Sequence, residues 1–541
     1  MKLAIAQINT TVGDLEGNIR HILDAARSVA DQKPDLIVFP ELTVCGYPPR
    51  DILYDASFVE AVQLATKDLA HQARALPPLL VGSFAPAPAS RKIYEHPSLY
   101  NVAYLMQNGD MKIAQVKQLL PIYDVFYEPR WFLAGTKTLP PIDIAGTKVG
   151  VMICEDMWDE EYPVHPGADL KKMGAEMLIC ISASPYRRGA GEGRVYHAKR
   201  QVETRSSTTG FASFDKLRIA SPSAQSEMPL VFVNLVGGND ELIFDGGSFV
   251  VGGERLKMFE EEVKVIEDGS WRMDHGAGRP LTINHDPSNE EEVFRALVLG
   301  LRDFADKNGL QHAFIGLSGG IDSSVVAVVA AEALGRERVT GVAIPSRFTD
   351  ARSTESAREL AERLGIGFEV VELEKMHKAA EQTVGAERSG GVGGENIQAR
   401  LRMVILMSFV NQRGGFLINT SNKTELTLGY GTLYGDLAGT VSPLGDLTKP
   451  EVYALARWIN GVRNSIPQFM MERKPSAELR ADQVDPFDYE KISPEVEALV
   501  RSNQSNPAMR TSEHKRWQAG VILKVSGKSF GRGRLMPITR K

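Results

Sequence analysis

Cysteine is scarce in this sequence. Only Cys45, Cys154 and Cys180 occur among 541 residues, and no two of them have the spacing of a metal-binding pair. Three cysteines in so long a chain do not make a disulfide framework, so the sequence favours a reducing, cytoplasmic compartment. Each cysteine is therefore either core filler or a nucleophile.

Long apolar runs and an excess of positive charge are also missing. No stretch approaches the roughly 20 apolar residues that span a bilayer. The formal net charge of −6 and the isoelectric point near 6.0 argue against a general nucleic-acid-binding protein. The first residues, Met1 to Gln7, lack a signal-peptide pattern and predict a buried strand. We therefore expect small-molecule partners, with neither nucleic acid nor membrane among them.

Short apolar segments alternate with helical stretches, over a length that calls for two or more domains. This alternation predicts parallel sheets flanked by helices, an α/β fold. Because acidic and turn-forming residues interrupt it, we expect a first domain over 1–260, a linker over 261–289 and a second domain over 290–541. A Gly-rich stretch, 389–394, is expected to be a mobile loop. The predicted strands are 36–40, 79–83, 148–153, 177–181, 229–234, 246–251, 313–317, 339–342, 368–371 and 416–419.

The clearest chemical feature is a turn rich in glycine and serine. Ser318-Gly319-Gly320-Ile321-Asp322-Ser323 stands between a predicted strand and an apolar helix. Its glycines let successive N–H groups point at one anion, and the helix adds its positive end. Asp322 can hold a divalent cation that bridges phosphate oxygens. A plain capping turn would explain a looser pattern, but the complete hexapeptide here predicts a phosphate site.

This turn lacks the lysine of kinase-type loops and resembles the loop of enzymes that split ATP into AMP and pyrophosphate. The motifs at 394–402, 420–425, 434–436 and 447–450 follow in order. Together they resemble the synthetase domain of NAD synthetases over about 290–541, which implies a doubly wound parallel sheet. The resemblance implies that ATP contacts Gly316, Leu317, Ser318, Gly319, Gly320, Ile321, Asp322, Ser323 and Thr420. It implies Mg²⁺ ligands at Asp322 and Glu425, and deamido-NAD contacts at Asn396, Glu425 and Lys515. Lys449 and Arg400 are implied as further phosphate contacts.

Three residues of the first half each stand where a predicted strand ends: Glu41, Lys117 and Cys154. A lone strand cysteine usually fills the core, but the acidic pair after Cys154 indicates the mouth of a strand. A neighbouring lysine lowers the pKa of a thiol, and a carboxylate can take the thiol proton. The three residues therefore predict a nucleophilic site.

These fragments resemble the carbon–nitrogen hydrolase, or nitrilase, superfamily over about residues 1–260. The resemblance implies an α-β-β-α sandwich with Glu41 as general base, Lys117 as transition-state stabiliser and Cys154 as nucleophile. Glu128 matches a supporting acid of that family.

The resemblance also implies a glutamine site at Tyr123 and Ser184. Six residues after Ser184 the family usually has Lys or Arg, and here it has Ala190. Arg187, Arg188 and Arg194 are the candidates to meet the glutamine carboxylate instead. We place Arg188 in the glutamine site.

The two resemblances complement each other, because an adenylate needs neutral ammonia and a glutaminase releases it. The combination resembles the glutamine-dependent NAD synthetases, ligases of NAD biosynthesis, and implies a homo-oligomer. The implied reaction converts ATP, deamido-NAD, glutamine and water into AMP, pyrophosphate, NAD and glutamate, through a thioester at Cys154 and a nicotinyl-adenylate.

Two alternatives remain open. One is another glutamine amidotransferase, such as a GMP- or asparagine-forming synthetase. Lys2 at the second position and the lack of a Gly-x-Cys-x-Gly elbow at Cys154 disfavour it. The other is an amidase with a nucleotide-sensing second half, which the complete loop and Glu425 disfavour.

Overall fold

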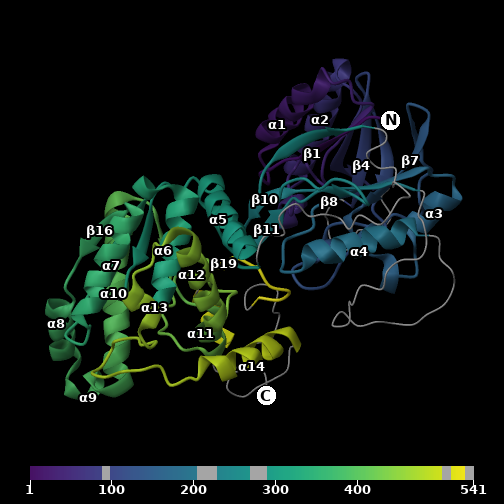
Figure 1. The fold of residues 1–541 in the computed structure, drawn as a ribbon. Helices are drawn as coiled ribbons and strands as arrows, with labels where there is room; N and C mark the ends of the chain where they lie inside the picture. Colours follow the sequence, from purple (N-terminus) through teal and green to yellow (C-terminus); the bar gives the residue numbers. More distant parts are fainter. Residues whose placement is uncertain (88–97, 204–227, 268–288, 503–512, 519, 530–541) are drawn as a thin grey trace. The chain divides into compact units, whose positions relative to one another are not determined.

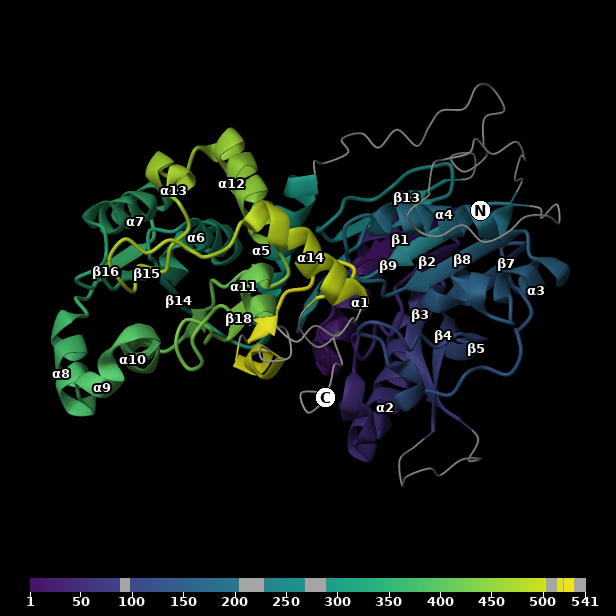
Figure 2. The same ribbon diagram turned by 90° about the horizontal axis from the view of Figure 1, so that it is seen from below.

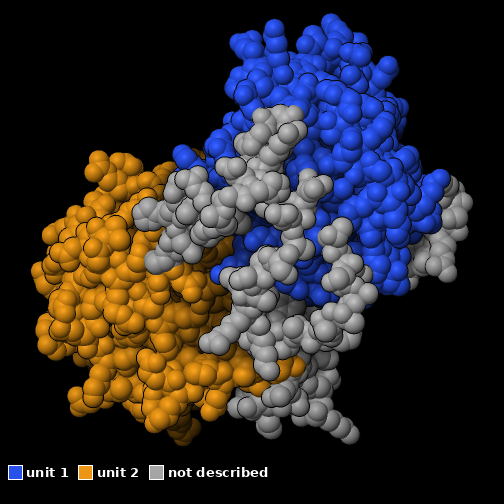
Figure 3. All heavy atoms as spheres, turned by 45° about the vertical axis from the view of Figure 1, so that its right-hand side comes forward, with its two compact units in different colours: residues 1–185, 189–237, 244–285 blue, residues 186–188, 238–243, 286–541 orange. Residues whose placement is uncertain are grey.

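The computed structural model describes residues 1–87, 98–203, 228–267, 289–502, 513–518 and 520–529. The chain forms two compact units, coloured separately in Figure 3. The first holds Met1–Pro185, Gly189–Gly237 and Phe244–His285, and the second holds Tyr186–Arg188, Gly238–Ile243 and Asp286–Lys541. Two short segments of the N-terminal half thus belong to the second unit. Within the described ranges, no helix has the length and apolar character needed to span a membrane.

Two sheets packed face to face build the first unit (Figure 1). Their strand orders are β13-β1-β2-β3-β4-β5 and β12-β9-β8-β7-β6. The first sheet contains β1 (Leu3–Gln7), β2 (Leu36–Val38), β3 (Leu79–Pro86), β4 (Leu99–Gln107), β5 (Asp110–Val116) and β13 (Glu262–Ile266). The second contains β6 (Ile142–Ile144), β7 (Thr147–Ile153), β8 (Met177–Ser182), β9 (Leu230–Asn234) and β12 (Phe249–Val250). A hairpin of β10 (Val236–Asn239) and β11 (Leu242–Asp245) stands apart from both sheets.

The alternation of side chains along β7 shows how the layers form. Val149 and Val151 enter the core between the sheets, whereas Met152 packs in a separate cluster with Leu170 and Ala198. Successive strand residues point to opposite faces, so one apolar strand serves two cores. Helices α1 (Leu15–Ala30) and α2 (Ala56–Gln72) lie against the first sheet, and α3 (Pro166–Lys172) and α4 (Ala190–Val202) against the second. The predicted α-β-β-α sandwich is confirmed.

A single sheet of parallel strands forms the centre of the second unit, in the order β16-β15-β14-β17-β18-β19. These strands are β14 (Ala313–Gly316), β15 (Val339–Ala343), β16 (Gly367–Val370), β17 (Phe416–Ile418), β18 (Val441–Ser442) and β19 (Val521–Ile522). Numbered along the chain, the order is 3-2-1-4-5-6, that of a doubly wound sheet. In such sheets ligands bind where the order reverses, here between the carboxyl ends of β14 and β17.

Helices cover both faces of this sheet (Figure 2). On one face lie α5 (Asn289–Lys307), α6 (Ile321–Leu334), α7 (Ala351–Leu364) and α12 (Lys449–Arg463), and on the other lies α10 (Gly391–Arg413). The apolar side of α10 packs Ile405 and Leu406 on Phe314 of β14. The remaining helices are α8 (Glu374–Val384), α9 (Ala386–Ser389), α11 (Lys423–Leu428), α13 (Gln468–Glu472) and α14 (Tyr489–Ser502).

Each strand predicted from the sequence overlaps a strand of the structure, but two other segments differ from expectation. Residues 262–266, placed in the linker, form β13 and pair antiparallel with β1. Residues 268–288 of that linker lie outside the described part of the chain. The loop predicted over 389–394 is wrong, because α10 begins at Gly391. A Cβ on Gly394 would lie 2.1 Å from the carbonyl oxygen of Ser389, so glycine there permits a close approach to α9 rather than a loop.

Candidate active sites

Glu41, Lys117 and Cys154 meet in the first unit. Glu41 lies in the turn after β2, while Lys117 and Cys154 directly follow β5 and β7. Lys117 Nζ lies 2.7 Å from Glu41 Oε1, and the Cys154 thiol interacts electrostatically with both groups. Glu41 and Lys117 are each 0% exposed, and Cys154 is 5% exposed. Three strand ends thus bring a carboxylate, an ammonium and a thiol into one buried cluster.

Lys117 is held between two carboxylates. Glu128 Oε2 lies 2.8 Å from Nζ, on top of the contact with Glu41. Burial disfavours the charged form of Lys117 and so lowers its pKa. The attraction of Glu128 and Glu41 outweighs this effect and raises the pKa of Lys117 well above its usual value. Burial also raises the pKa of Glu128 to about 7, against the attraction of Lys117. Burial therefore disfavours the charged form of Glu128, although Lys117 and Tyr47 both donate to it.

Two further donors fix Glu41. Asn101 Nδ2 donates to Oε1 at 2.7 Å, and the backbone N–H of Ala183 donates to Oε2 at 3.0 Å. Both carboxylate oxygens are therefore held, which fixes the orientation of a group suited to proton transfer.

Cys154 has the backbone geometry of a nucleophile on a sharp turn. Its φ of 47° lies in the left-handed region, which costs a non-glycine residue about 1–3 kcal/mol. Burial raises the pKa of its thiol well above the usual value, Glu41 adds to this rise, and Lys117 opposes it. The thiol therefore stays protonated at rest, and a base must take its proton before it can attack.

Tyr123 and Glu155 lie beside this cluster. The hydroxyls of Tyr123 and Tyr162 donate to the two oxygens of Glu155, at 2.9 and 3.0 Å. Glu155 directly follows Cys154, and half of the Tyr123 side chain is exposed, at 50%. A buried carboxylate and a phenol thus stand next to Cys154.

The residues predicted around Ser184 have different surroundings. Arg194 is buried and donates through Nε to Ser184 Oγ at 3.1 Å and through Nη1 to Asp245 at 2.8 Å. Arg194 therefore holds Ser184 in place. Arg188 instead donates to Glu451 in the second unit, so the predicted contact of Arg188 with glutamine stays a prediction.

In the second unit the Gly-Ser turn has the shape of an anion cradle. Gly319 has a φ of +77°, and a Cβ there would lie 2.5 Å from the Ser353 carbonyl oxygen. Helix α6 begins at Ile321 with Gly320 as its N-cap, so its positive end faces the turn. Ser323 and Ser324 donate to the Gly320 carbonyl oxygen at 3.0 and 2.7 Å. Glycine is required at 319 for both conformation and space.

Asp322, Glu425 and Lys449 form a second charged cluster. Lys449 Nζ contacts Asp322 Oδ2 and lies 3.3 Å from Glu425 Oε1. Asn422 caps α11 through Glu425 N–H and donates to Asp322 Oδ1 at 3.0 Å. Burial raises the pKa of Glu425 to about 7, Lys449 lowers it and Asp322 raises it. The two predicted metal ligands thus lie side by side, at the point where the strand order reverses.

The predicted deamido-NAD residues Asn396 and Lys515 converge on one loop. Lys515 Nζ donates to the carbonyl oxygens of Gly429 and Gly431 at 2.7 and 2.9 Å. Thr432, the next residue, donates to Asn396 Oδ1 at 2.7 Å. The loop follows α11, which carries Glu425.

The remaining predicted residues lie in two places. Gly316 and Leu317 lead from β14 into the turn, and Thr420 follows β17 across the switch point. The Nε of Arg400 donates a hydrogen bond to the backbone carbonyl oxygen of Leu433 at 3.1 Å.

Comparison with known proteins links both halves to families. The carbon–nitrogen hydrolase family matches residues 2–254, and the NAD synthase family matches residues 293–527. A glutamine-dependent NAD(+) synthetase of Synechocystis sp. is 35% identical over 99% of the chain and 98% of the relative, and one of Thermotoga maritima is 35% identical over 100% and 99%. The chain belongs to the glutamine-dependent NAD(+) synthetases. A solved synthetase of this family from Acinetobacter baumannii, in complex with ADP, superimposes with a TM-score of 0.75 at 27% identity, over 99% of the chain and 98% of that structure.

Membership in the glutamine-dependent NAD(+) synthetases accounts for two sites on one chain. Sequence reasoning missed three residues of these sites: Asn101, Glu155 and Asn422. Asn422 carried a usable signal, because Asn-x-x-Glu before a helix is a capping pattern. Asn101 carried none, since it lies within β4 and only packing brings it to Glu41.

Proposed function

We propose that this chain forms NAD from deamido-NAD, ATP, glutamine and water, and releases AMP, pyrophosphate and glutamate. The observation that carries the proposal is the presence on one chain of the buried Glu41–Lys117–Cys154 cluster and the Gly-Ser turn beside Asp322 and Glu425. Neither cluster alone supplies an amide: the first releases ammonia, and the second needs it.

The glutaminase half begins with proton transfer from Cys154 to Glu41. The sulfur attacks the side-chain amide carbon of glutamine, and Lys117 stabilises the negative charge on the amide oxygen. Glu41 returns the proton to the departing nitrogen, so NH₃ leaves and a thioester remains. Glu41 then takes a proton from water, and the hydroxide attacks the thioester carbon. The carbon–sulfur bond breaks, glutamate is released, and Glu41 returns the proton to the Cys154 thiolate. The two donors that fix Glu41 favour this repeated proton transfer.

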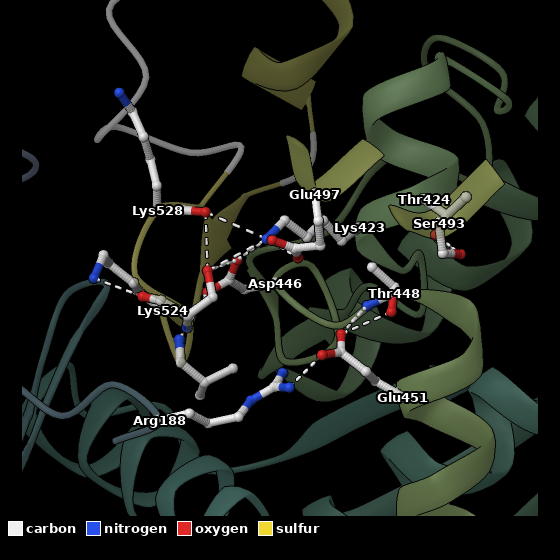
Figure 4. Close-up of polar contacts among 12 residues, drawn as sticks. Arg188, Lys423, Thr424, Asp446, Thr448, Glu451, Ser493, Glu497, Lys524 and Lys528 are labelled. Carbon is white, nitrogen blue, oxygen red and sulfur yellow. Dashed lines mark hydrogen bonds and ion pairs between the residues drawn. The ribbon is translucent and has the colours of Figure 1, made fainter. Parts of the chain in front are cut away.

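Glutamine is held by Tyr123 and Ser184 in this proposal. Glu155, between two tyrosine hydroxyls, supplies a negative charge next to the nucleophile and suits the α-ammonium of an amino acid. The contact between Arg188 and the carboxylate of glutamine stays a prediction, because the Arg188 guanidinium donates to Glu451 (Figure 4).

In the amidating half, Gly316 to Ser323 and Thr420 bind ATP. The deamido-NAD carboxylate attacks the α-phosphorus, pyrophosphate leaves, and a nicotinyl-adenylate forms. Asp322 and Glu425 are the residues that would hold Mg²⁺, which would supply positive charge to the phosphates of the substrate. Ammonia then attacks the adenylate, and AMP leaves with NAD formed. Asn396, Glu425 and Lys515 contact deamido-NAD.

Three further points belong to the proposal. Ammonia passes through the protein interior, because most free ammonia is protonated at neutral pH and cannot attack. The chain works as a homo-oligomer, as the family resemblance implies. The cytoplasm is its compartment, which the scarcity of cysteine supports.

A paired variant assay tests the proposal. Cys154→Ala is expected to lower glutamine-dependent NAD synthesis by at least about a thousandfold while ammonium salt still supports synthesis. Asp322→Ala is expected to lower synthesis at least about a hundredfold with either nitrogen source while glutamine hydrolysis survives. Glutamate, AMP, pyrophosphate and NAD are measured together. If Cys154→Ala also fails with ammonium, the division of labour is wrong. An amidase with a nucleotide-sensing half would release no AMP or pyrophosphate.

A further inference from the structure

Asp156 is a buried carboxylate that the proposed glutaminase steps do not use. It lies in the short helix Cys154–Met157, two residues after the proposed nucleophile, and it is 0% exposed. Its hydrogen-bond donors are three backbone N–H groups. A charged group is costly to bury, so its partners show what it holds in place.

The two oxygens of this carboxylate bind two different segments of the chain. Oδ1 accepts from the N–H groups of Gln118 and Leu119, each at 2.9 Å. Oδ2 accepts from the N–H of Ile153 at 3.2 Å. Gln118 directly follows Lys117, and Ile153 directly precedes the proposed nucleophile. One side chain therefore ties together the two backbone segments that carry the ammonium group and the thiol.

This tie crosses from one sheet of the first unit to the other. Lys117 directly follows β5 of the first sheet, and Cys154 directly follows β7 of the second (Figure 2). The apolar packing between the sheets is non-directional, so it does not by itself fix the separation of two polar groups at the strand ends. Three directional hydrogen bonds to one carboxylate do fix it.

Cys154 needs such a restraint because its backbone is strained. A φ of 47° is unfavourable by about 1–3 kcal/mol and persists only where surrounding contacts enforce it. The hydrogen bond from Ile153 to Asp156 closes the turn around the cysteine, since its donor precedes Cys154 and its acceptor follows it. Asp156 thus restrains the sulfur as well as the segment of Lys117.

Only a carboxylate can accept from all three donors in this arrangement. Ionised aspartate has two acceptor oxygens, whereas asparagine has one and places an NH₂ donor where the other oxygen lay. Burial raises the pKa of Asp156 to about 7, although the three N–H donors and Lys117 lower it. Serine, threonine or asparagine would cap a turn without burying a charge.

We propose that Asp156 is a positioning residue for glutamine hydrolysis, which sets the distance between the ammonium group of Lys117 and the sulfur of Cys154. This inference rests on the proposed function. In that reaction the ammonium group meets the amide oxygen of glutamine while the sulfur meets the neighbouring carbon, so both groups must converge on one C=O bond. A misplacement of about 1 Å can lower a reaction rate roughly a hundredfold.

Asp156→Asn tests the tie at almost unchanged side-chain volume. The amide oxygen can hold the Gln118–Leu119 pair or Ile153, but not both. We expect kcat for glutamine hydrolysis to fall about a hundredfold, while ammonium-dependent NAD synthesis matches wild type. Glutamate release and NAD formation measure the two activities.

Glutamine binding is measured separately by calorimetry in a Cys154→Ala background, which cannot form the thioester. Adding Asp156→Asn to this background is expected to change the Kd for glutamine by less than about threefold. Retained binding shows that the glutamine site of the first unit is still folded, so a fall in kcat then reports on position.

The reactivity of Cys154 gives a readout that a purely structural role would not move. Alkylation by iodoacetamide is followed against pH, with Cys154→Ala as the blank for Cys45 and Cys180. Lys117 lowers the pKa of the Cys154 thiol, so its displacement raises the pH at which alkylation begins. Removal of a negative charge by itself would lower that pH, so the direction of the shift separates lost position from lost charge.

Asp159→Asn is the matched control. Asp159 is 5% exposed and lies three residues further along the same segment. Its partners are Gln201 Nε2 at 2.9 Å and His165 Nδ1 at 3.1 Å, neither of which is next to Lys117 in the chain. The same change from carboxylate to amide is therefore expected to leave kcat for glutamine hydrolysis within about twofold of wild type.

The outcomes separate this inference from the proposed function. Glutamine hydrolysis that survives Cys154→Ala overturns the proposed function. Hydrolysis that needs Cys154 but keeps its kcat in Asp156→Asn overturns the positioning role alone, and so does an alkylation profile that is unchanged or shifted to lower pH. Equal losses in Asp156→Asn and Asp159→Asn, or lost glutamine binding in the double variant, assign Asp156 to stability and also overturn it.

Discussion

At the scale of single residues, charge is distributed unevenly around Cys154. Glu41 accepts hydrogen bonds from Asn101, Lys117 and a backbone N–H, whereas Glu128 accepts from Lys117 and Tyr47. Two carboxylates that share one lysine therefore differ in their surroundings. Burial raises the pKa of Glu128 to about 7, whereas both oxygens of Glu41 accept hydrogen bonds.

The shifted pKa of Glu128 predicts a pH dependence of stability. Burial raises this pKa from 4.5 to about 7, so between these values the folded protein holds a proton that the unfolded chain has lost. The contribution of Glu128 to the free energy of unfolding therefore falls as pH rises through this window, by up to roughly 1.4 kcal/mol per pH unit. Urea unfolding of wild type and Glu128→Gln at pH 5 and 7 measures it.

The neutral amide of Glu128→Gln serves as the reference. Wild type should lose stability relative to this variant between pH 5 and pH 7. A constant difference in unfolding free energy at the two pH values would show that Glu128 is ionised throughout.

At the scale of elements, helix starts carry most of the residues that we propose for the amidation site. The Gly-Ser turn lies at the positive end of α6. Glu425 lies at the positive end of α11, and Lys449 lies at the positive end of α12. Carboxylates and phosphates are favoured at such ends because unpaired N–H groups point outward. The capping residues Asn422 and Thr448 therefore place Glu425 and Lys449 as well as stabilise the two helices.

The turn before α6 predicts a strong response to one methyl group. Gly319→Ala places a Cβ against the Ser353 backbone and forces alanine to a φ of +77°. We expect a loss of at least about 1–2 kcal/mol in unfolding free energy and the loss of ATP-dependent synthesis, with glutaminase retained. Thermal unfolding and NAD formation measure the two effects.

Gly461→Ala is the matched control for this substitution. Gly461 lies in α12, and nothing lies within 4 Å of a Cβ placed there. Alanine there should be neutral or stabilising by up to about 1 kcal/mol. Equal effects of the two substitutions would contradict the tight turn at Gly319.

At the scale of the whole molecule, the chain joins a nitrogen source to a nitrogen acceptor. The two units have separate cores, and the segments 186–188 and 238–243 of the N-terminal half belong to the second unit. Gly238 donates its N–H to Asp303 at 2.6 Å and accepts from Lys307 at 2.8 Å, both on α5. The N-terminal half therefore supplies parts of the unit that carries the amidation site.

Internal transfer of ammonia predicts an isotope result. With glutamine labelled by ¹⁵N in its amide and a large excess of unlabelled ammonium, NAD should carry mainly ¹⁵N, because ammonia formed at Cys154 does not mix with the solvent. Mass spectrometry of the NAD amide gives the ratio. A ¹⁵N content of the NAD amide that is diluted to the proportion of free ammonium would contradict internal transfer. Cys154→Ala with ammonium alone provides the unlabelled reference.

Local pattern and motif determined much of this protein. The strands, the layered α/β folds and the Gly-Ser turn are predictable because side-chain alternation and glycine conformations act over a few residues. The positions of Glu41, Lys117 and Cys154 at strand ends predict that the three residues meet, as they do in the structure. The start of α10 was misread because a run of glycines specifies little by itself, and its close approach to Ser389 depends on packing.

Only the tertiary structure decided which charges meet. Asn101 reaches Glu41 across 60 positions, and Arg188 reaches Glu451 across 263, so no local pattern records either contact. The sequence offered three arginines near Ser184, and the fold engages Arg194 with Asp245 and Arg188 with Glu451. Sequence thus determined the two kinds of chemistry, whereas folding decided their partners, because burial forces each charged group to find the nearest opposite charge.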